Sequence, residues 1–156
     1  MKLAVFSDSH GKTDGMLRAV RESRPDRIIH LGDYARDAFA VERAFPELQH
    51  HCVRGNCDFA PDAPDSLLLS LEGKNILITH GHIHGVKSGL SALFAAAGKA
   101  GADIVLFGHT HKALQCERDG VRFINPGAAG GFRSPGWAEL LINSKEPFVT
   151  CTLRVF

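Results

Sequence analysis

The sequence predicts an α/β fold for the first two thirds of the chain, followed by antiparallel β structure. Short apolar runs recur along the chain, two segments with helical spacing lie between the early runs, and the part after about residue 110 has the pattern of hairpins. Alternating strands and helices are typical of a mostly parallel sheet covered by helices. The 156 residues contain no repeat, low-complexity segment or long linker, so we expect a single domain over residues 1–156.

Eight short apolar runs have the length and the β-branched content of strands. They are residues 2–7, 27–32, 49–55, 75–81, 103–108, 121–125, 138–143 and 148–156.

Two segments have the spacing of amphipathic helices. Residues 14–25 place Met16, Leu17 and Val20 on one face before Pro25 ends the helix. Residues 88–101 form the second helix, which should end at one of two glycines, Gly98 or Gly101. Its apolar face has i, i+3, i+4, i+7 spacing and consists of Leu90, Leu93, Phe94 and Ala97.

Composition excludes several classes of protein. The formal net charge is +1, from 18 basic and 17 acidic residues, so we expect no stable binding to nucleic acid. No apolar run approaches the roughly 18 residues of a membrane span, and the opening MKLAVFSDSHG becomes polar too soon for a signal peptide. The four cysteines contain no CxxC pair. Together these features predict a cytoplasmic protein with reduced thiols and no membrane partner.

Side chains that commonly bind metals follow five predicted strands, at the point where each strand ends. Ligands of open α/β sheets lie beyond the carboxyl ends of the strands, so these five blocks should meet at one rim. Glycines at positions 32, 55, 81 and 108 would let the backbone turn sharply beside them. The blocks are Ser7-Asp8-Ser9-His10, Gly32-Asp33, Gly55-Asn56-Cys57-Asp58, Thr79-His80-Gly81-His82 and Gly108-His109-Thr110-His111.

The types of ligand indicate the metals. Imidazoles with carboxylates and an amide, and no required thiolate, suit Mn, Fe, Co, Ni or Zn better than Mg or Ca. The blocks offer more ligands than one ion needs if water and substrate are also to bind, so we expect two ions. At the usual spacing of roughly 3.5 to 4 Å, two ions activate a bridging water and stabilise both oxygens of an in-line displacement.

Each block alone has a simpler structural explanation, since one such motif is more often a turn, a cap or a satisfied polar group. We expect His30 to be a hydrogen-bonded core residue, and His50 and His51 to precede the third strand at the opposite rim. His82 is an even choice between a role at the substrate and none. The roles of His84, a loop residue, and Cys57, a packed side chain or one facing the phosphate, stay open.

The ordered blocks DSH, GD, GNCD, THGH and GHTH resemble the calcineurin-like metallophosphoesterase superfamily. GNCD and a late NPG make the chain similar to the compact bacterial and archaeal phosphodiesterases of that superfamily. The resemblance runs from Asp8 to about Gly127. It implies a four-layer α/β/β/α sandwich of two mixed sheets flanked by helices, with the metal site at one edge.

The resemblance also implies a role for each block. The first ion would be bound by Asp8, His10 and His111, and Asp33 would bridge. The second ion would be bound by Asn56, His80 and His109. A hydroxide bridging the ions would be the nucleophile. The resemblance does not fix the metal, because zinc, iron, manganese and nickel all occur in such enzymes; we expect Mn first, with Fe, Ni, Zn or Co as alternatives.

The chain departs from the superfamily pattern at Cys57. Many members have Asn-His-Glu or Asn-His-Asp where this chain has Asn56-Cys57-Asp58, and that histidine is thought to protonate the leaving group. Its absence should favour aryl or other activated phosphodiesters over alkyl phosphomonoesters. We expect His82 to be the substitute donor, so that the expected catalytic residues are His82, Asn56 and Asp33.

A second departure lies in the late NPGA block. Ala128 stands where relatives often carry serine, and the preceding segment Asn125-Pro126-Gly127 should shape a turn beneath the site.

The sequence therefore predicts a metal-dependent phosphodiesterase for a small-molecule or nucleotide-like phosphodiester. Residues 59–70 and 83–90 should form the walls that select the substrate. One alternative is a non-catalytic protein-binding scaffold of the same fold, such as the retromer subunit of the superfamily. Another is a phosphomonoesterase or protein phosphatase. Whether exposed sheet edges pair into a homo-oligomer stays open.

Overall fold

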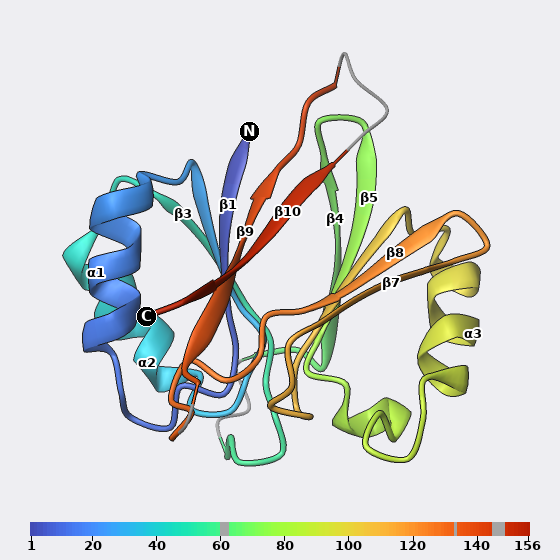
Figure 1. Cartoon of the computed structure of the whole chain (residues 1–156), viewed down its shortest axis with the longest axis horizontal. Helices are drawn as coiled ribbons and strands as arrows, with labels where there is room; N and C mark the ends of the chain where they lie inside the picture. The colour runs from blue at the N-terminus through green and yellow to red at the C-terminus, as the bar shows by residue number, and fades with distance from the viewer. Residues whose placement is uncertain (60–62, 133, 145–148) are drawn as a thin grey trace.

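A computed structural model describes residues 1–59, 63–132, 134–144 and 149–156. Its strands form two five-stranded sheets that face each other (Figure 1). The first sheet has the order β10-β9-β1-β2-β3. Its strands are β1 (Lys2–Phe6), β2 (Arg27–His30), β3 (Gln49–Cys52), β9 (Gly136–Leu141) and β10 (Thr150–Val155). The second sheet has the order β4-β5-β6-β8-β7. Its strands are β4 (Ser66–Leu71), β5 (Lys74–Thr79), β6 (Ile104–Phe107), β7 (Leu114–Arg118) and β8 (Val121–Asn125).

Both sheets are mixed, with parallel strands in the part that carries the five blocks. Strands β1, β2 and β3 run parallel, while β9 pairs antiparallel with both β1 and β10. In the second sheet β5, β6 and β8 run parallel, and the edge strands β4 and β7 are antiparallel. The five blocks follow the carboxyl ends of β1, β2, β3, β5 and β6.

Helices cover the outer face of each sheet (Figure 1). Helices α1 (Asp14–Ser23) and α2 (Arg36–Ala44) lie against the first sheet, and α3 (Ser91–Ala100) lies against the second. A short 3-10 helix, η1 (His82–His84), follows β5. The four-layer α/β/β/α sandwich is therefore confirmed. Among the described residues, no helix has the length and apolar character required to cross a bilayer.

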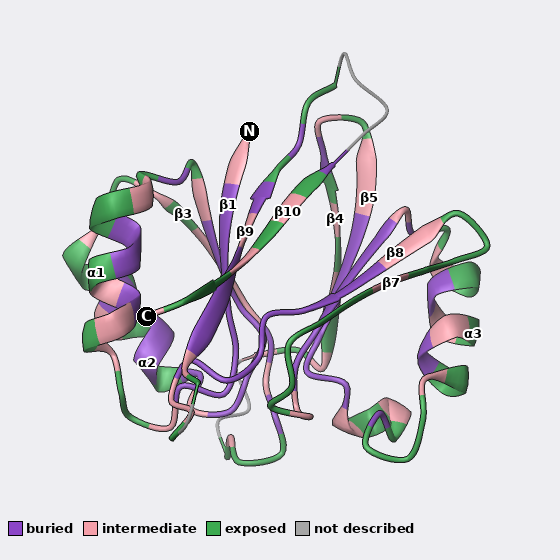
Figure 2. Ribbon diagram, in the orientation of Figure 1, coloured by how far each residue is buried: buried purple, intermediate pink, exposed green. Residues whose placement is uncertain are grey.

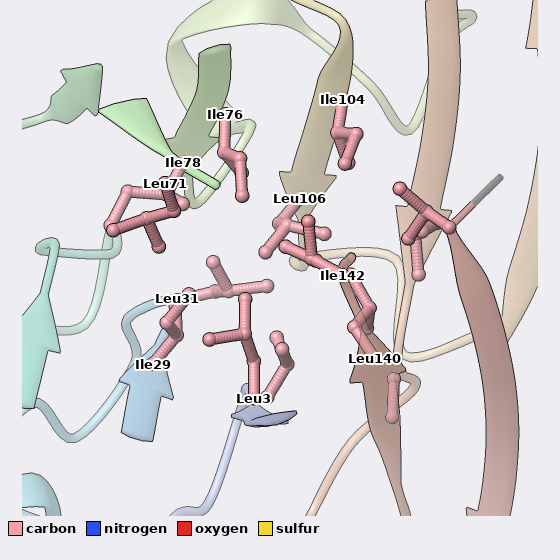
Figure 3. Close-up of a cluster of buried hydrophobic side chains, with 14 of the residues drawn as sticks. Leu3, Ile29, Leu31, Leu71, Ile76, Ile78, Ile104, Leu106, Leu140 and Ile142 are labelled. Carbon is pink, nitrogen blue, oxygen red and sulfur yellow. The ribbon is translucent and has the colours of Figure 1, made fainter. Parts of the chain in front are cut away.

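Three apolar layers hold the sandwich together, and alternate residues of one strand enter different layers. Leu3 and Val5 of β1 point into the layer between the sheets, whereas Ala4 and Phe6 pack under α1 and α2. The sequence of a strand that is buried on both faces is a continuous apolar run, which explains the pattern of the KLAVF segment. Figure 2 shows this burial along the central strands, and Figure 3 shows the layer between the sheets.

The two predicted helices are present, with shorter bounds. Helix α1 ends at Ser23 because Arg24 adopts a left-handed φ of 48°, just before Pro25. Helix α3 ends at Gly101, which has a φ of 60°, and Gly98 lies inside the helix. Met16 and Val20 of α1 and Leu93 and Ala97 of α3 are buried, as predicted. The other predicted residues, Leu17, Phe94 and Leu90, are half-buried, and Leu90 lies just before α3. Ala19, which was not part of the predicted face, is also buried.

Four elements were not predicted: α2, β4, β7 and the 3-10 helix η1. Helix α2 has nine residues and two buried apolar ones, Ala38 and Val41, too few for a clear helical period. Strand β4 is an edge strand with alternating exposure, and β7 is mostly exposed. The hairpin pattern after residue 110 was correct for β7 with β8 and for β9 with β10, but β8 also pairs parallel with β6. Residue 148, the first of the last predicted strand, lies outside the described residues.

Candidate metal centre

The five loops converge at one rim, where six of the seven predicted ligands form two groups. Within each group the ligand atoms lie within 4.8 Å of one another. Asp33 belongs to both groups, so its carboxylate stands between them. One group is Asp8, His10, Asp33 and His111, and the other is Asp33, His80 and His109.

Asp8 is buried, and its two carboxylate oxygens have different surroundings. Its Oδ2 accepts hydrogen bonds from Ser7 Oγ at 2.5 Å and from the backbone N–H of His109 at 3.1 Å. Its Oδ1 has no hydrogen-bond partner in the described part of the chain, although it lies 3.0 Å from His111 Nε2 and 4.0 Å from His80 Nε2. A buried carboxylate oxygen that faces imidazole nitrogens without a hydrogen bond suits a cation between them.

The ring of His80 is oriented by its other nitrogen. His80 Nδ1 lies 2.8 Å from the carbonyl oxygen of Leu31, so it carries the proton and leaves the Nε2 lone pair facing the site. That Nε2 lies 3.5 Å from Asp33 Oδ1 and 3.1 Å from His109 Nδ1. A histidine ligand held through its second nitrogen by a carbonyl is the usual arrangement around bound metals.

His10 supplies a further unpaired nitrogen, since its buried Nε2 has no hydrogen-bond partner. The donor set of carboxylate oxygens and imidazole nitrogens therefore fits divalent first-row metals, and its unpaired atoms are those a cation would satisfy.

Asp33 is held in its place by the loop after β3. The backbone N–H of Cys57 donates to Asp33 Oδ1 at 2.8 Å. The carboxylate of Asp58 accepts the N–H groups of Asp33, Gly55 and Ala35, which joins the loops after β2 and β3. Burial opposes ionisation of Asp33, but the bond from Cys57 and the nearby His80 outweigh it and lower the pKa of Asp33. The residue is thus a carboxylate at neutral pH.

Gly32 and Gly55 allow the two loops to touch. A Cβ on Gly32, whose φ is 95°, would lie 2.5 Å from the backbone nitrogen of Gly55. A Cβ on Gly55 would overlap Asp33 Oδ1 and lie 2.5 Å from the Asp33 backbone nitrogen. A side chain at Gly32 would therefore need the backbone at Arg54 and Gly55 to move, and a side chain at Gly55 would need Asp33 to move.

The backbone is left-handed at five of the predicted ligands. Their φ angles lie between 48° and 67°, a region that residues other than glycine rarely adopt and that costs of order 1–2 kcal/mol each, less for Asp. Strained backbone concentrates at functional sites, where the surrounding fold holds it. The five residues are Asp8, His10, Asp33, His109 and His111.

Two imidazoles at the rim are kept neutral. Burial, helped by the nearby His80, lowers the pKa of both His82 and His109. Only a neutral imidazole has a lone pair for a metal, so His109 is in the form that binding requires.

Two predicted residues lie beside the groups. Asn56 is exposed, its side-chain amide lies 3.3 Å from Cys57 Sγ, and its loop adjoins the second group. The ring of His82 lies 5.4 Å from that of His80 and 6.2 Å from that of His109, and its buried Nδ1 has no hydrogen-bond partner among the described residues.

The other predictions for single residues have mixed outcomes. His30 is a buried, hydrogen-bonded core histidine, as predicted, and burial lowers its pKa to about 4. His50 and His51 lie within β3 and not before it, where they contact Phe45 O and Arg27 respectively. The strand begins at residue 49, where the predicted run 49–55 begins, so both histidines belong to the strand itself.

The turn at the NPG block also behaves as predicted. The buried amide of Asn125 donates to Gly108 O at 2.9 Å and to Thr110 Oγ1 at 3.1 Å, and it accepts the N–H of Gly127. It thus fixes the loop that carries His109 and His111.

Sequence reasoning missed the residues that support the ligands. Asp37 Oδ2 accepts Ser9 Oγ and the N–H of Gly11, both at 2.7 Å, which ties the loop of His10 to α2. No motif marks Asp37. Asp58 lies inside the GNCD block, so its position in that motif could have indicated its supporting role.

Comparison with known proteins agrees with this geometry. Residues 1–143 match the family model described as the calcineurin-like phosphoesterase superfamily domain. The chain is 39% identical over 131 residues to the probable metallophosphoesterase YsnB of Bacillus subtilis, covering 82% of this chain and 75% of that protein. It is 30% identical over 153 residues to the phosphodiesterase YfcE of Escherichia coli K12, covering 82% and 79% of the two chains.

A solved structure supports the fold alone. Wild-type Vps29 of Entamoeba histolytica, determined with Zn²⁺, superimposes with a TM-score of 0.80 at 21% identity and covers 99% of each chain. The family match covers nearly the whole chain, and it includes every loop that meets at the rim. This protein therefore belongs to the calcineurin-like phosphoesterase superfamily, whose members use divalent metals.

Proposed function

We propose that this chain is a phosphodiesterase whose site takes two divalent cations. The observation that carries the proposal is that the Asp33 carboxylate belongs to both ligand groups. Asp8, His10 and His111 complete the first group, and His80 and His109 complete the second. We assign Asn56, in the adjoining loop, as a further ligand of the second ion. When bound, two such cations lower the pKa of a water between them and stabilise negative charge on the phosphate oxygens.

The protein's own residues orient this chemistry. Asp33 is held ionised by the N–H of Cys57, and Asp8 is held by Ser7 and the His109 backbone. His82 lies beside the second group with an unpaired nitrogen, so we assign it the hydrogen bond to the leaving oxygen.

Cys57 does not replace the missing histidine in our proposal. Burial and the neighbouring Asp33 raise the pKa of its thiol, so it stays a protonated, weak donor at neutral pH. Without a strong acid at position 57, diesters with good leaving groups should react faster than alkyl monoesters. Manganese is our first choice for the metal, and Fe, Ni, Zn or Co suit the same donors.

The first experiment measures metal content by elemental mass spectrometry and hydrolysis of bis(p-nitrophenyl) phosphate and of its monoester, with and without added Mn²⁺. We expect about two ions per chain and faster hydrolysis of the diester. Asp33→Asn should lower both metal content and diesterase activity, the activity by at least about a hundredfold, because supporting residues alone cost 10 to 100-fold. Asp119→Asn, at an exposed turn with the same left-handed φ, is the matched control.

A scaffold role is the second candidate, because the chain is also 38% identical over 110 residues to vacuolar protein sorting-associated protein 29 of Schizosaccharomyces pombe. That match covers 67% of this chain and 56% of that protein. The unpaired Asp8 and His10 atoms favour the metal-dependent role. Less than one ion per chain after reconstitution, with no turnover, would favour the scaffold, and a preference for the monoester would favour a phosphomonoesterase.

A further inference from the structure

An apolar pocket of about 500 Å³ opens next to the metal centre. Its volume lies within the ~300–1,000 Å³ range of pockets for small ligands. The described residues that line it include Tyr34, Arg36, Phe39, Cys57, Phe59 and Pro64.

Two of these residues adjoin the metal ligands. Tyr34 directly follows Asp33, and its ring lies edge-on to that of His10 at 5.3 Å. Cys57 holds Asp33 Oδ1 through its backbone N–H. A phosphate at the two ligand groups would therefore have one ester group close to the mouth of the pocket.

Tyr34 is held in a strained conformation. Its φ is 63°, which is a genuine outlier for a bulky residue, and it follows another left-handed residue, Asp33. This backbone conformation places the Tyr34 ring between the metal ligands and the pocket. Strained backbone is concentrated at functional sites, so a role for this ring in function would explain the strain.

The remaining walls suit a planar ring. The Arg36 guanidinium lies 4.8 Å from the centroid of the Tyr34 ring, and among the described residues it has no carboxylate partner. Phe39 of α2 is 57% exposed and Phe59 is 98% exposed. Exposed aromatic rings together with a guanidinium provide stacking surfaces for another aromatic ring, and the unpaired positive charge favours an anionic ligand.

We propose that this pocket binds a planar aromatic ester group of the phosphodiester substrate, between Tyr34 with Arg36 and the rings of Phe39 and Phe59. The inference rests on the proposed function and adds the class of substrate. It differs from a preference for good leaving groups, because the ring contributes to binding whether or not its ester bond is the one that breaks.

The test is calorimetric binding of diphenyl phosphate and dimethyl phosphate to the metal-reconstituted protein. The two anions share the phosphate and differ only in their ester groups, and release of phenol or methanol is measured in parallel so that the heat of binding is separated from turnover. We expect diphenyl phosphate to bind about tenfold more tightly or better. Thymidylyl-thymidine, whose rings are separated from phosphate by sugars, distinguishes a nucleobase from an aryl ester.

Variants assign the preference to the pocket. Phe39→Ala changes an exposed helical residue and should remove most of the preference for a ring while leaving dimethyl phosphate binding unchanged. Arg36→Gln should weaken the same preference. Leu141→Ala is the control, because Leu141 is also an exposed apolar residue, 44% exposed, but pairs with Lys2 at the opposite end of the first sheet.

The outcomes separate this inference from the proposed function. Equal binding of all three ligands, or a ring preference that survives both Phe39→Ala and Arg36→Gln, would overturn the inference. Diester hydrolysis with no ring preference would refute only the pocket. A Phe39-dependent ring preference without any hydrolysis would support the pocket and contradict the diesterase proposal.

Discussion

Replacing Gly55 with alanine tests whether close packing of the loops after β2 and β3 sets the position of Asp33. The added methyl group would overlap Asp33 Oδ1 and lie 2.9 Å from its Cγ, so Asp33 has to move. Because no positive φ is found at Gly55, the substitution adds volume without adding backbone strain. The expected result is a less stable protein that also binds its metals more weakly.

The size of the effect follows from this overlap. Forcing one methyl group into a packed site costs about 1–3 kcal/mol. For a chain of this length each kcal/mol lowers the melting temperature by about 2–4 °C, so we expect a decrease of about 2–12 °C. Displacing Asp33 should also weaken metal binding by about 10 to 100-fold, the usual effect of disturbing the support of a ligand.

Differential scanning calorimetry measures the first effect and metal titration the second. The control is Gly98→Ala, since a Cβ at this position of α3 meets nothing within 4 Å. That change should stabilise the protein by about 0.5–1 kcal/mol and leave metal binding unchanged. If Gly55→Ala melts like the wild type and binds metal with the same affinity, the packing argument is wrong.

Three further predictions concern single residues. Asn125→Ala leaves the buried Gly108 carbonyl without its side-chain donor, so it should cost about 1–3 kcal/mol in chemical denaturation and weaken metal binding through the loop of His109 and His111. Cys57→His should raise the rate for alkyl esters by about tenfold or more relative to aryl esters, because it restores a proton donor, and an unchanged ratio would contradict that role. Because burial lowers the pKa of His30 to about 4, the unfolded chain gains a proton below pH 6.5 that the native chain does not. Stability should therefore fall as the pH falls from 6.5 to 4, by up to about 3 kcal/mol, and urea titrations should show a smaller decrease in His30→Gln.

The candidate site was easier to predict from sequence than the fold around it. Six of the residues that we propose as ligands could be selected from the sequence, because carboxylates and imidazoles at strand ends have few purely structural uses when they recur five times, and the structure brings these six together. The support of these ligands could not be predicted, because Asp37 reaches Ser9 and Gly11 across more than 25 residues without any local pattern.

The division into two sheets followed from the family resemblance and not from the pattern of residues. Strand β1 is buried on both faces, by helices on one side and by the second sheet on the other. Its sequence would be the same continuous apolar run if helices covered both faces, so the run does not reveal the second sheet. The short α2 and the edge strands β4 and β7 bury too few side chains to produce a period. The single-domain assignment, the cytoplasmic location, the lack of nucleic-acid binding and the oligomeric state stay predictions.

The order of strands has a consequence for how the chain folds during synthesis. All strands of the second sheet come from one continuous segment, residues 66–125, whereas the first sheet needs β9 and β10 from the end of the chain beside β1 from its beginning. Contacts between distant segments form late because closing long loops costs entropy. We therefore expect the growing chain to assemble the half that carries His80 and His109 first. Asp33 would reach them only when the first sheet closes, so the ability to hold metal should appear as one of the last events of folding.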